Sequence, residues 1–129
     1  MGQNEYGDEH GWIFFNAAIG KRIKDINLYD NVLGITFEDG YRIRIFDAGQ
    51  ACCERRYMRT DDDLDYFIGA KLMGAEVKNA PNIPDGDNFH EVQFFEIQTD
   101  KGVFTMSSHN EHNGYYGGFF LRVDAVEPN

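Results

Sequence analysis

Apolar residues in much of this chain recur at every second position, which is the spacing of β-strands rather than of helices. In residues 41–46, Tyr41, Ile43 and Ile45 alternate with two arginines. An apolar run at 32–37 precedes them, and the sequence Glu-Asp-Gly between the two runs is typical of a tight turn. The pattern therefore predicts a β-hairpin in this part of the chain.

The second half of the chain continues this pattern. Residues 89–99 and 103–108 are apolar-rich runs separated by Asp-Lys-Gly, and they predict a second hairpin. Residues 70–80 predict a strand with Gly74 at a bulge, since glycine inside a strand often marks an extra residue. Residues 115–126 predict the final strand.

Residues 60–69 carry the strongest helix signal. Thr60 is a good N-cap, Asp63 stands where a capping box has its acidic residue, and Gly69 is a typical helix end. Residues 12–20 are apolar and end in glycine, so they predict either a short strand or one helical turn.

These elements together predict one α+β domain over residues 1–129, a length typical of a single domain. We expect a twisted, mostly antiparallel β-sheet of about six strands with one short helix packed on it, and a flexible tail at residues 1–11. No apolar run is long enough to span a bilayer, and the polar N-terminus does not resemble a signal peptide. We therefore expect a cytoplasmic protein without a membrane partner.

Charge narrows the possible partners. The chain has 22 acidic and 12 basic residues, for a formal net charge of -10. Its basic residues between 42 and 59 are followed at once by Asp61, Asp62 and Asp63. Because such a chain repels nucleic acid phosphates, we expect no direct nucleic acid binding. We expect instead a partner protein with a basic surface, which the acidic residues would contact.

Two arginines in the same region are candidates for ligand binding. Arg55 and Arg56 can hold an anionic group, or they can pair with Glu54 and the aspartates that follow. The aspartates themselves have a second interpretation, because negative charge stabilises the first turn of a helix.

Cys52 and Cys53 are the only cysteines, and they are adjacent. A disulfide between neighbours would be strained, so we expect a reduced pair with at least one buried thiol. A redox or metal role is the alternative. A Cys–His nucleophile pair with His90, His109 or His112 also stays open, because such partners meet only in the fold.

The segment HNEHNGYYGGFFL at residues 109–121 concentrates imidazole, amide and aromatic groups. Its candidate binding residues are His109, Asn110, His112, Asn113, Tyr115 and Tyr116. Gly117-Gly118 would let a ligand or another backbone approach closely. Asn113-Gly114 is also a strong turn signal, so the segment can equally be a turn that leads into a strand. A metal held by two histidines would need a third ligand, and we predict neither a metal nor a cofactor.

Three motifs, CCERRYMRTDDDL at 52–64, HEVQF at 90–94 and HNEHNGYYGGF at 109–119, resemble those of a family of uncharacterised small proteins found in phages and bacteria. The resemblance spans about residues 32–121. It implies no activity. It implies a phage or prophage accessory gene, and small acidic proteins of that kind often act against host defence.

The sequence thus predicts a non-enzymatic binding protein, in concrete form an anti-CRISPR-like inhibitor that engages a basic, nucleic-acid-binding host protein in the host cytoplasm. The first alternative is a protein that binds a small ligand or nucleotide signal with residues 109–119, Arg55 and Arg56. The second is a metal- or cysteine-dependent enzyme, although the chain contains no complete catalytic signature. The pattern predicts no particular oligomeric state.

Overall fold

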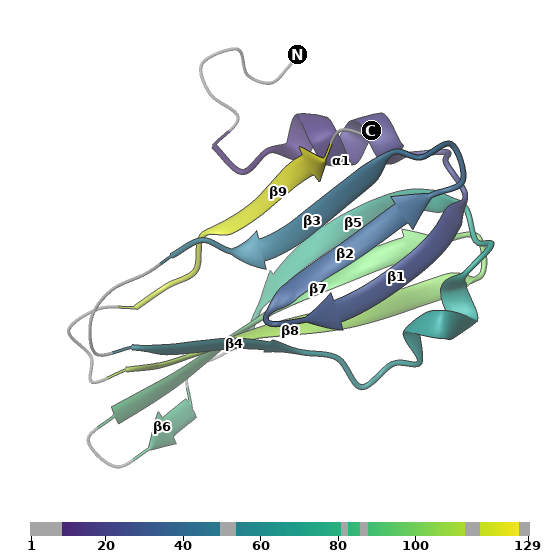
Figure 1. The fold of residues 1–129 in the computed structure, drawn as a ribbon. Coiled ribbons are helices and arrows are strands. Elements are labelled where there is room, and N and C mark those ends of the chain that lie inside the picture. The colour runs from purple at the N-terminus through teal and green to yellow at the C-terminus, as the bar shows by residue number, and fades with distance from the viewer. Residues whose placement is uncertain (1–8, 50–53, 81–82, 86–87, 113–116, 127–129) are drawn as a thin grey trace.

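The computed structural model describes residues 9–49, 54–80, 83–85, 88–112 and 117–126, and within them two antiparallel sheets lie face to face (Figure 1). The elements are α1 (Trp12–Ala18), β1 (Ile23–Tyr29), β2 (Val32–Phe37), β3 (Arg42–Asp47), β4 (Arg55–Arg59), the 3-10 helix η1 (Leu64–Phe67), β5 (Leu72–Asn79), β6 (Ile83–Asp85), β7 (Asn88–Thr99), β8 (Gly102–His112) and β9 (Leu121–Val126).

The strands divide into two sheets, whereas the sequence predicted one sheet of about six strands. The first sheet has the order β1-β2-β3-β9, and the second has the order β4-β8-β7-β5 with β6 paired to β7. The class, mostly antiparallel β with a short helix, is confirmed. The prediction of a single sheet was wrong because every strand pair has one apolar face to bury. One short helix is too small to cover all of these faces. Each sheet covers the other instead.

The core lies between the sheets and follows the alternation along the strands. In β3, Ile43 and Ile45 are fully buried, and in β8, Phe104 and Met106 are too. α1 packs beside β9 and closes one side of the sandwich (Figure 1). Its Trp12 ring lies 5.7 Å from that of Phe95, centroid to centroid.

The two helical predictions had different outcomes. Residues 12–18 form α1, so the helical interpretation of this segment is confirmed. The helix predicted over 60–69 is reduced to η1, and the predicted capping box is absent. Thr60 Oγ1 donates to the carbonyl of Thr105, and Asp62 accepts the Thr105 N–H. These bonds hold the segment against β8 and use the groups that would have begun a longer helix.

Turns and bulges largely follow the sequence patterns. The hairpin of β2 and β3 and the hairpin of β7 and β8 are both present. The register of β5 shifts between Leu72 and Gly74, as the glycine predicted. Asp30 and Asn31 both have positive φ in a two-residue turn between β1 and β2. The Asn31 side chain accepts the Met58 N–H and thereby occupies part of the outer edge of β4.

Most of the predicted N-terminal tail, residues 1–8, lies outside the described residues. The last part of it, residues 9–11, is described and makes contacts through His10. The ring of His10 stacks on Phe120 at 4.8 Å, and the carbonyl of His10 accepts the Val123 N–H. These contacts attach the start of α1 to β9.

Neither described helix has the length and apolar character needed to cross a membrane.

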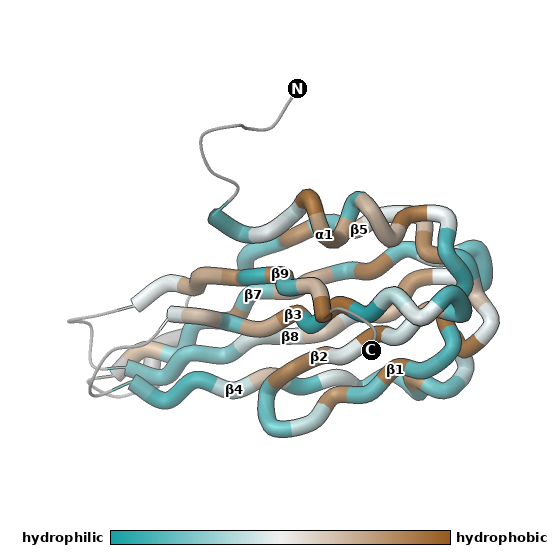
Figure 2. The backbone as a smooth tube through the Cα atoms, turned by 45° about the horizontal axis from the view of Figure 1, so that its top comes forward, coloured by the Kyte–Doolittle hydropathy of each residue, from teal (hydrophilic) through white to brown (hydrophobic). Residues whose placement is uncertain are grey.

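At one end of the sandwich, β4, β6, β7 and β8 of the second sheet extend beyond the first sheet (Figure 1). This projecting part is hydrophilic compared with the middle of the molecule (Figure 2). β8 continues to His112, so residues 109–112 are strand and not the predicted turn. β9 begins at Leu121 rather than near 115. The described parts of two polar segments singled out from the sequence, around Arg56 and Asn110, meet at this end.

Candidate functional site

Strand alternation places the candidate residues of β8 on opposite faces of the second sheet. Asn110 and His112 are buried on the inner face, while His109 lies on the outer face. The two histidines that the sequence placed in one loop therefore point in opposite directions. Asn113, Tyr115 and Tyr116, like Cys52 and Cys53, lie outside the described residues.

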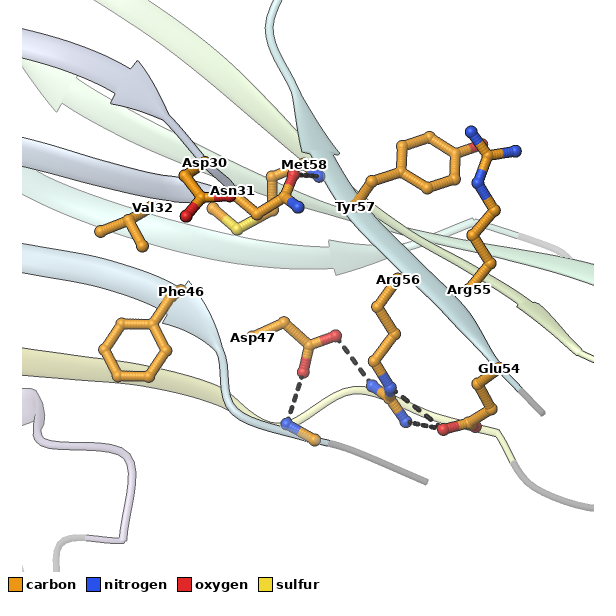
Figure 3. A pocket seen from close by; sticks show the side chains of 11 residues that line it. Asp30, Asn31, Val32, Phe46, Asp47, Glu54, Arg55, Arg56, Tyr57 and Met58 are labelled. Atoms are coloured by element: carbon orange, nitrogen blue, oxygen red, sulfur yellow. Dashed lines mark hydrogen bonds and ion pairs between the residues drawn. The ribbon is translucent and has the colours of Figure 1, made fainter. Parts of the chain in front are cut away.

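The same alternation separates the two candidate arginines of β4. Arg55 pairs in register with Glu111 and Arg56 with Asn110, so they face opposite sides. Figure 3 shows Arg56 directed toward Asp47 and Glu54, and Arg55 projecting away on the other side of the strand. Their chemistry differs accordingly.

We call the inner group the inner network. It consists of Asp47, Glu54, Arg56, Glu91, Asn110, His112 and Gly118. Arg56 is its centre: Nη1 donates to Asp47 Oδ2 at 2.8 Å, and Nη2 donates to Glu54 Oε1 at 2.8 Å. The three side chains are only 15%, 6% and 1% exposed for Arg56, Asp47 and Glu54. A guanidinium between two carboxylates in this geometry is a buried, hydrogen-bonded ion triad.

Asn110 links β8 to this triad. Its Nδ2 donates to Glu54 Oε2 at 3.0 Å and to the carbonyl of Gly118 at 3.1 Å. These two acceptors determine how the amide is oriented, since the opposite orientation would place its oxygen against theirs. Asn110 Oδ1 is buried and has no hydrogen-bond partner within the described residues.

His112 continues the network toward β7. Its Nε2 lies 2.8 Å from Glu91 Oε1, and the same carboxylate oxygen accepts the Gly118 N–H at 2.7 Å. Gly118 has φ +81, a conformation that favours glycine, and a Cβ on Gly117 would lie 2.8 Å from Glu91 Oε1. The close approach at Gly117 is therefore made by the protein's own side chains.

Electrostatics maintain the charges of the triad. Burial by itself would raise the pKa of Glu54, but hydrogen bonds from Asn110 and Arg56 and the positive charge of Arg56 together lower it. Burial alone would lower the pKa of Arg56, and its bonds to Asp47 and Glu54 reverse this and raise it. Glu54 and Arg56 therefore stay ionised at neutral pH, and the inner network acts as the polar end of the core.

A cavity of about 480 Å³ lies beside this network, between β4 and the ends of β2 and β3 (Figure 3). Val32, Phe46 and Met58 supply its apolar wall. The guanidinium of Arg56 in this cavity already binds two carboxylates, so it offers little to an anionic ligand. Arg56 thus pairs with Glu54, as the second interpretation of the sequence expected.

We call the outer group the outer cluster. It consists of Arg55, Tyr57, Arg59, His90, Ser107, His109 and Glu111. The rings of Tyr57 and His109 are parallel, with an interplanar angle of 1° and centroids 4.7 Å apart. The guanidinium carbons of Arg55 and Arg59 lie 4.9 and 5.6 Å from the Tyr57 ring centroid. The cluster is thus an aromatic stack with a cation at each end of β4.

Hydrogen bonds hold the rings in place. The Tyr57 hydroxyl donates to Glu111 Oε2 at 2.6 Å. His109 Nδ1 lies 2.9 Å from His90 Nε2, and His109 Nε2 lies 2.9 Å from Ser107 Oγ. If His90 donates to His109 and His109 to Ser107, the serine hydroxyl can donate to the Arg59 carbonyl, 3.3 Å away. In that assignment, each hydrogen bond of the series from His90 through His109 and Ser107 to the Arg59 carbonyl has one donor and one acceptor.

The pKa values in the outer cluster respond to these contacts. The hydrogen bond from Tyr57 to Glu111 raises the pKa of Tyr57, and burial makes a smaller contribution in the same direction. The same bond is the main cause that lowers the pKa of Glu111. Burial is the largest cause of the lowered pKa of His109, and Coulombic interactions with His90 and Arg59 lower it further, while Glu111 opposes them. The neutral imidazole is therefore favoured at His109.

The outer cluster has partial resemblance to a catalytic site. Ser107 and His109 are within hydrogen-bond distance, as a nucleophile and its base would be. Ser107, however, lies in β8, an inner strand of the second sheet, where backbone N–H groups are used by the ladders to β4 and β7. No pair of backbone donors there is placed to stabilise an oxyanion.

Metal binding was an open alternative for His109 and His112. The structure separates these two and brings His109 to His90 instead. Among the described residues, no group of three or more His, Cys, Asp or Glu side chains is arranged to hold a metal ion.

The acidic candidates lie on a separate surface. We call Asp61, Asp62, Asp63 and Asp65 the acidic segment. All four are exposed: Asp61, Asp62 and Asp63 lie between β4 and η1, and Asp65 lies in the first turn of η1. Asp62 accepts the Thr105 N–H at 2.7 Å, so the segment is attached to β8 at that point. None of the ion pairs formed within the described residues involves these four carboxylates.

Sequence reasoning identified Arg55 and His109 of the outer cluster as binding candidates. It named His90 only as a possible partner of a cysteine and missed the other members. The missing signal was alternation: Arg55, Tyr57 and Arg59 occupy every second position of β4. Ser107, His109 and Glu111 do the same in β8, but the asparagine- and glycine-rich sequence that follows hid this pattern. His90 joins them only through the pairing of β7 with β8.

Comparisons with known proteins give a family but no function. Residues 16–121 match the model of a family described as a domain of unknown function, DUF7448. No curated protein and no solved structure matches the chain.

Proposed function

Because the chain belongs to the DUF7448 family, whose description assigns no function, we propose a function from its geometry: a non-catalytic binding protein whose recognition surface is the outer cluster. The observation that carries this proposal is the Tyr57–His109 stack with Arg55 and Arg59 beside it on a solvent-facing sheet surface.

The residue types support recognition. Tyrosine and arginine are enriched among the residues that contribute most of the free energy at protein interfaces. Tyr57 is held by Glu111 and His109 by Ser107, so the rings are ordered before a ligand arrives. A surface ordered in advance loses less conformational entropy on binding.

A purely structural role accounts for less of what is observed. The core is complete on the inner side of the second sheet, where Phe95, Ile97 and Phe104 are at most 1% exposed. A cross-strand pair on the outer side contributes only about 0.2–1 kcal/mol to folding. Folding alone therefore gives little reason for two cations, two imidazoles and a phenol to gather there.

The test uses Tyr57→Ala, with Tyr29→Ala as its matched control. Tyr29 is a 73% exposed tyrosine in β1, outside the outer cluster. Immobilised protein is incubated with host lysate, and the captured molecules are identified for each variant. We expect Tyr57→Ala to lose a specific partner that Tyr29→Ala and the unaltered protein retain. Equal capture by all three proteins would refute the outer cluster as the recognition surface.

A second candidate function rests on the acidic segment, whose carboxylates are exposed and outside every ion pair of the described residues. These carboxylates support contact with a basic protein. In its concrete form, this second candidate function is that of an anti-CRISPR-like inhibitor of a nucleic-acid-binding host protein. Opposite charges accelerate such association.

The test for this second function replaces charge without changing shape. The variant Asp61→Asn, Asp63→Asn, Asp65→Asn is compared with a control that removes three exposed carboxylates elsewhere, Asp25→Asn, Glu38→Gln, Glu76→Gln. We expect the first variant to associate more slowly with a basic partner and to show a weaker dependence on salt. The same change in both variants would mean that only net charge matters.

A further inference from the structure

The outer cluster has a local charge opposite in sign to that of the chain. It contains two guanidinium groups, those of Arg55 and Arg59, and one carboxylate, that of Glu111. The whole chain has a formal net charge of -10. An acidic protein that gathers cations at one ordered position creates a local site where an anion is attracted.

The two arginines keep donors available. Arg59 contacts the Tyr57 ring and has no carboxylate within ion-pair distance among the described residues. The Arg55 side chain is 73% exposed, and its Nη1 is 3.5 Å from Glu111 Oε1. Glu111 is shared, because its other oxygen accepts the shorter bond from Tyr57. Arg56, by contrast, is enclosed by two carboxylates at 2.8 Å.

Two guanidinium groups beside one aromatic ring suit an anion with several oxygens. Arg55 and Arg59 stand on either side of Tyr57 on one face of β4, and both guanidinium groups lie beside its ring. A carboxylate ligand is satisfied by one guanidinium fork, whereas the three terminal oxygens of a phosphate monoester can accept from two. The rings of His90 and His109 lie 6.4 and 4.7 Å from the Tyr57 ring, centroid to centroid, so their NMR signals report on this position.

We infer that the outer cluster binds a phosphate monoester carried by a small molecule, with Arg55 and Arg59 holding its oxygens. This inference rests on the proposed recognition surface and names the ligand chemistry. A small molecule fits better than a nucleic acid strand, because the acidic remainder of the chain repels a long row of phosphates.

The test is an NMR titration of the isotope-labelled full chain with adenosine 5′-monophosphate, inorganic phosphate and adenosine. We expect saturable shifts of the Tyr57, His90 and His109 signals with the first two and none with adenosine. The variant Arg55→Gln, Arg59→Gln should weaken binding at least about tenfold, a change of about 1.4 kcal/mol. The control Arg42→Gln, Arg44→Gln removes two exposed arginines of the first sheet and should bind normally.

Several results would overturn the inference. Adenosine that binds as well as its monophosphate would show recognition of the base, and equal weakening in both double variants would show a general effect of charge. The absence of any shift at millimolar phosphate, or Zn²⁺ binding at His90 and His109 without phosphate binding, would also overturn it. A single-stranded oligonucleotide that binds far more tightly than the monophosphate would assign the surface to nucleic acid.

The failure of this inference is distinct from failure of the proposed function. If no phosphate binds but partner capture still depends on Tyr57, the surface recognises something other than a phosphate monoester. If capture does not depend on Tyr57 either, the proposed function fails as well. Melting curves of every variant confirm that the compared proteins are folded.

Discussion

The two faces of the projecting end of the second sheet use similar residues in different ways. On the inner face Arg56 is 15% exposed and lies between two carboxylates, whereas on the outer face the neighbouring Arg55 side chain is 73% exposed. His112 contacts Glu91 in the interior, and His109 stacks on Tyr57 outside. One face closes the sandwich and the other remains available.

This difference shows how a strand assigns neighbouring residues to separate tasks. A dense polar motif in the sequence looks like one site, but alternation sends its members to opposite sides of the sheet. The inner residues then stabilise the fold, and the outer ones are free to bind. Substitutions at adjacent positions should therefore have different effects.

The largest effect is expected from Arg56→Met. It leaves the buried carboxylates of Asp47 and Glu54 without their cation, and breaking a buried ion pair in this way costs about 3–5 kcal/mol. Arg55→Met should change the free energy of unfolding by no more than about 0.5 kcal/mol. Urea unfolding of both variants measures the contrast. Similar losses for the two arginines would remove the distinction between the faces.

The second-largest effect is expected from acid, which should reduce the stability that the inner network contributes. Because the pKa of Glu54 is lowered in the folded protein, its ionised form contributes stability above its unfolded pKa of about 4.3. That contribution is lost as the pH falls through the folded pKa, so stability should decline steeply below about pH 4. Urea unfolding between neutral and acidic pH should show a smaller decline in Glu54→Gln.

Glu111→Gln is the control on the outer face, where the pKa of the carboxyl is also lowered. Its side chain is 32% exposed, against 1% for Glu54, so solvent screens its interactions more strongly. We expect a smaller change in acid sensitivity from this variant. An equal or larger change would place the acid-sensitive interactions on the outer face.

Tyr57→Phe should have a modest effect. It removes the hydroxyl that donates to Glu111 and keeps the ring that stacks on His109. The expected loss of stability is about 0.5–1.5 kcal/mol, the usual net contribution of one hydrogen bond. The pKa of Glu111 should rise toward its ordinary value, which a carbon NMR titration of the carboxyl can follow. An unchanged pKa would contradict the role assigned to this bond.

The smallest expected effect belongs to His109. Burial is the main cause of its lowered pKa, so the proton is bound more readily in the unfolded chain. Its contribution is therefore full above the unfolded pKa of about 6.5, and stability falls as the pH drops below that value. His109→Phe keeps an aromatic ring against Tyr57 and should flatten this slope, with melting shifts of about a few degrees. An unaltered slope would assign the pH dependence to other groups.

Much of the fold could be predicted because alternation is a local property. The strands around Ile43 and Phe104 and both hairpins follow from period-two patterns and turn residues. The helix at 60–69 could not be judged locally, because Thr60 and Asp62 bind Thr105, which is more than forty residues away. The division of the strands into two sheets rather than one also depends on how their apolar faces pack against each other.

The candidate site was only partly predictable for the same reason. Arg55 and His109 stood out by residue type, but Tyr57 and Ser107 had no distinguishing signal until β8 was known to continue to His112. His90 required the register of β7 against β8, which places it beside Glu111 and close to His109.

The sequence by itself determined an acidic chain of mostly antiparallel strands, since charge and alternation are written in consecutive residues. Only the tertiary structure decided which arginine is enclosed and which is exposed. Arg56 is enclosed because β4 pairs with β8 while the end of β3 brings Asp47 to the same side. Such contacts depend on strand register and sheet packing, which no short stretch of sequence specifies.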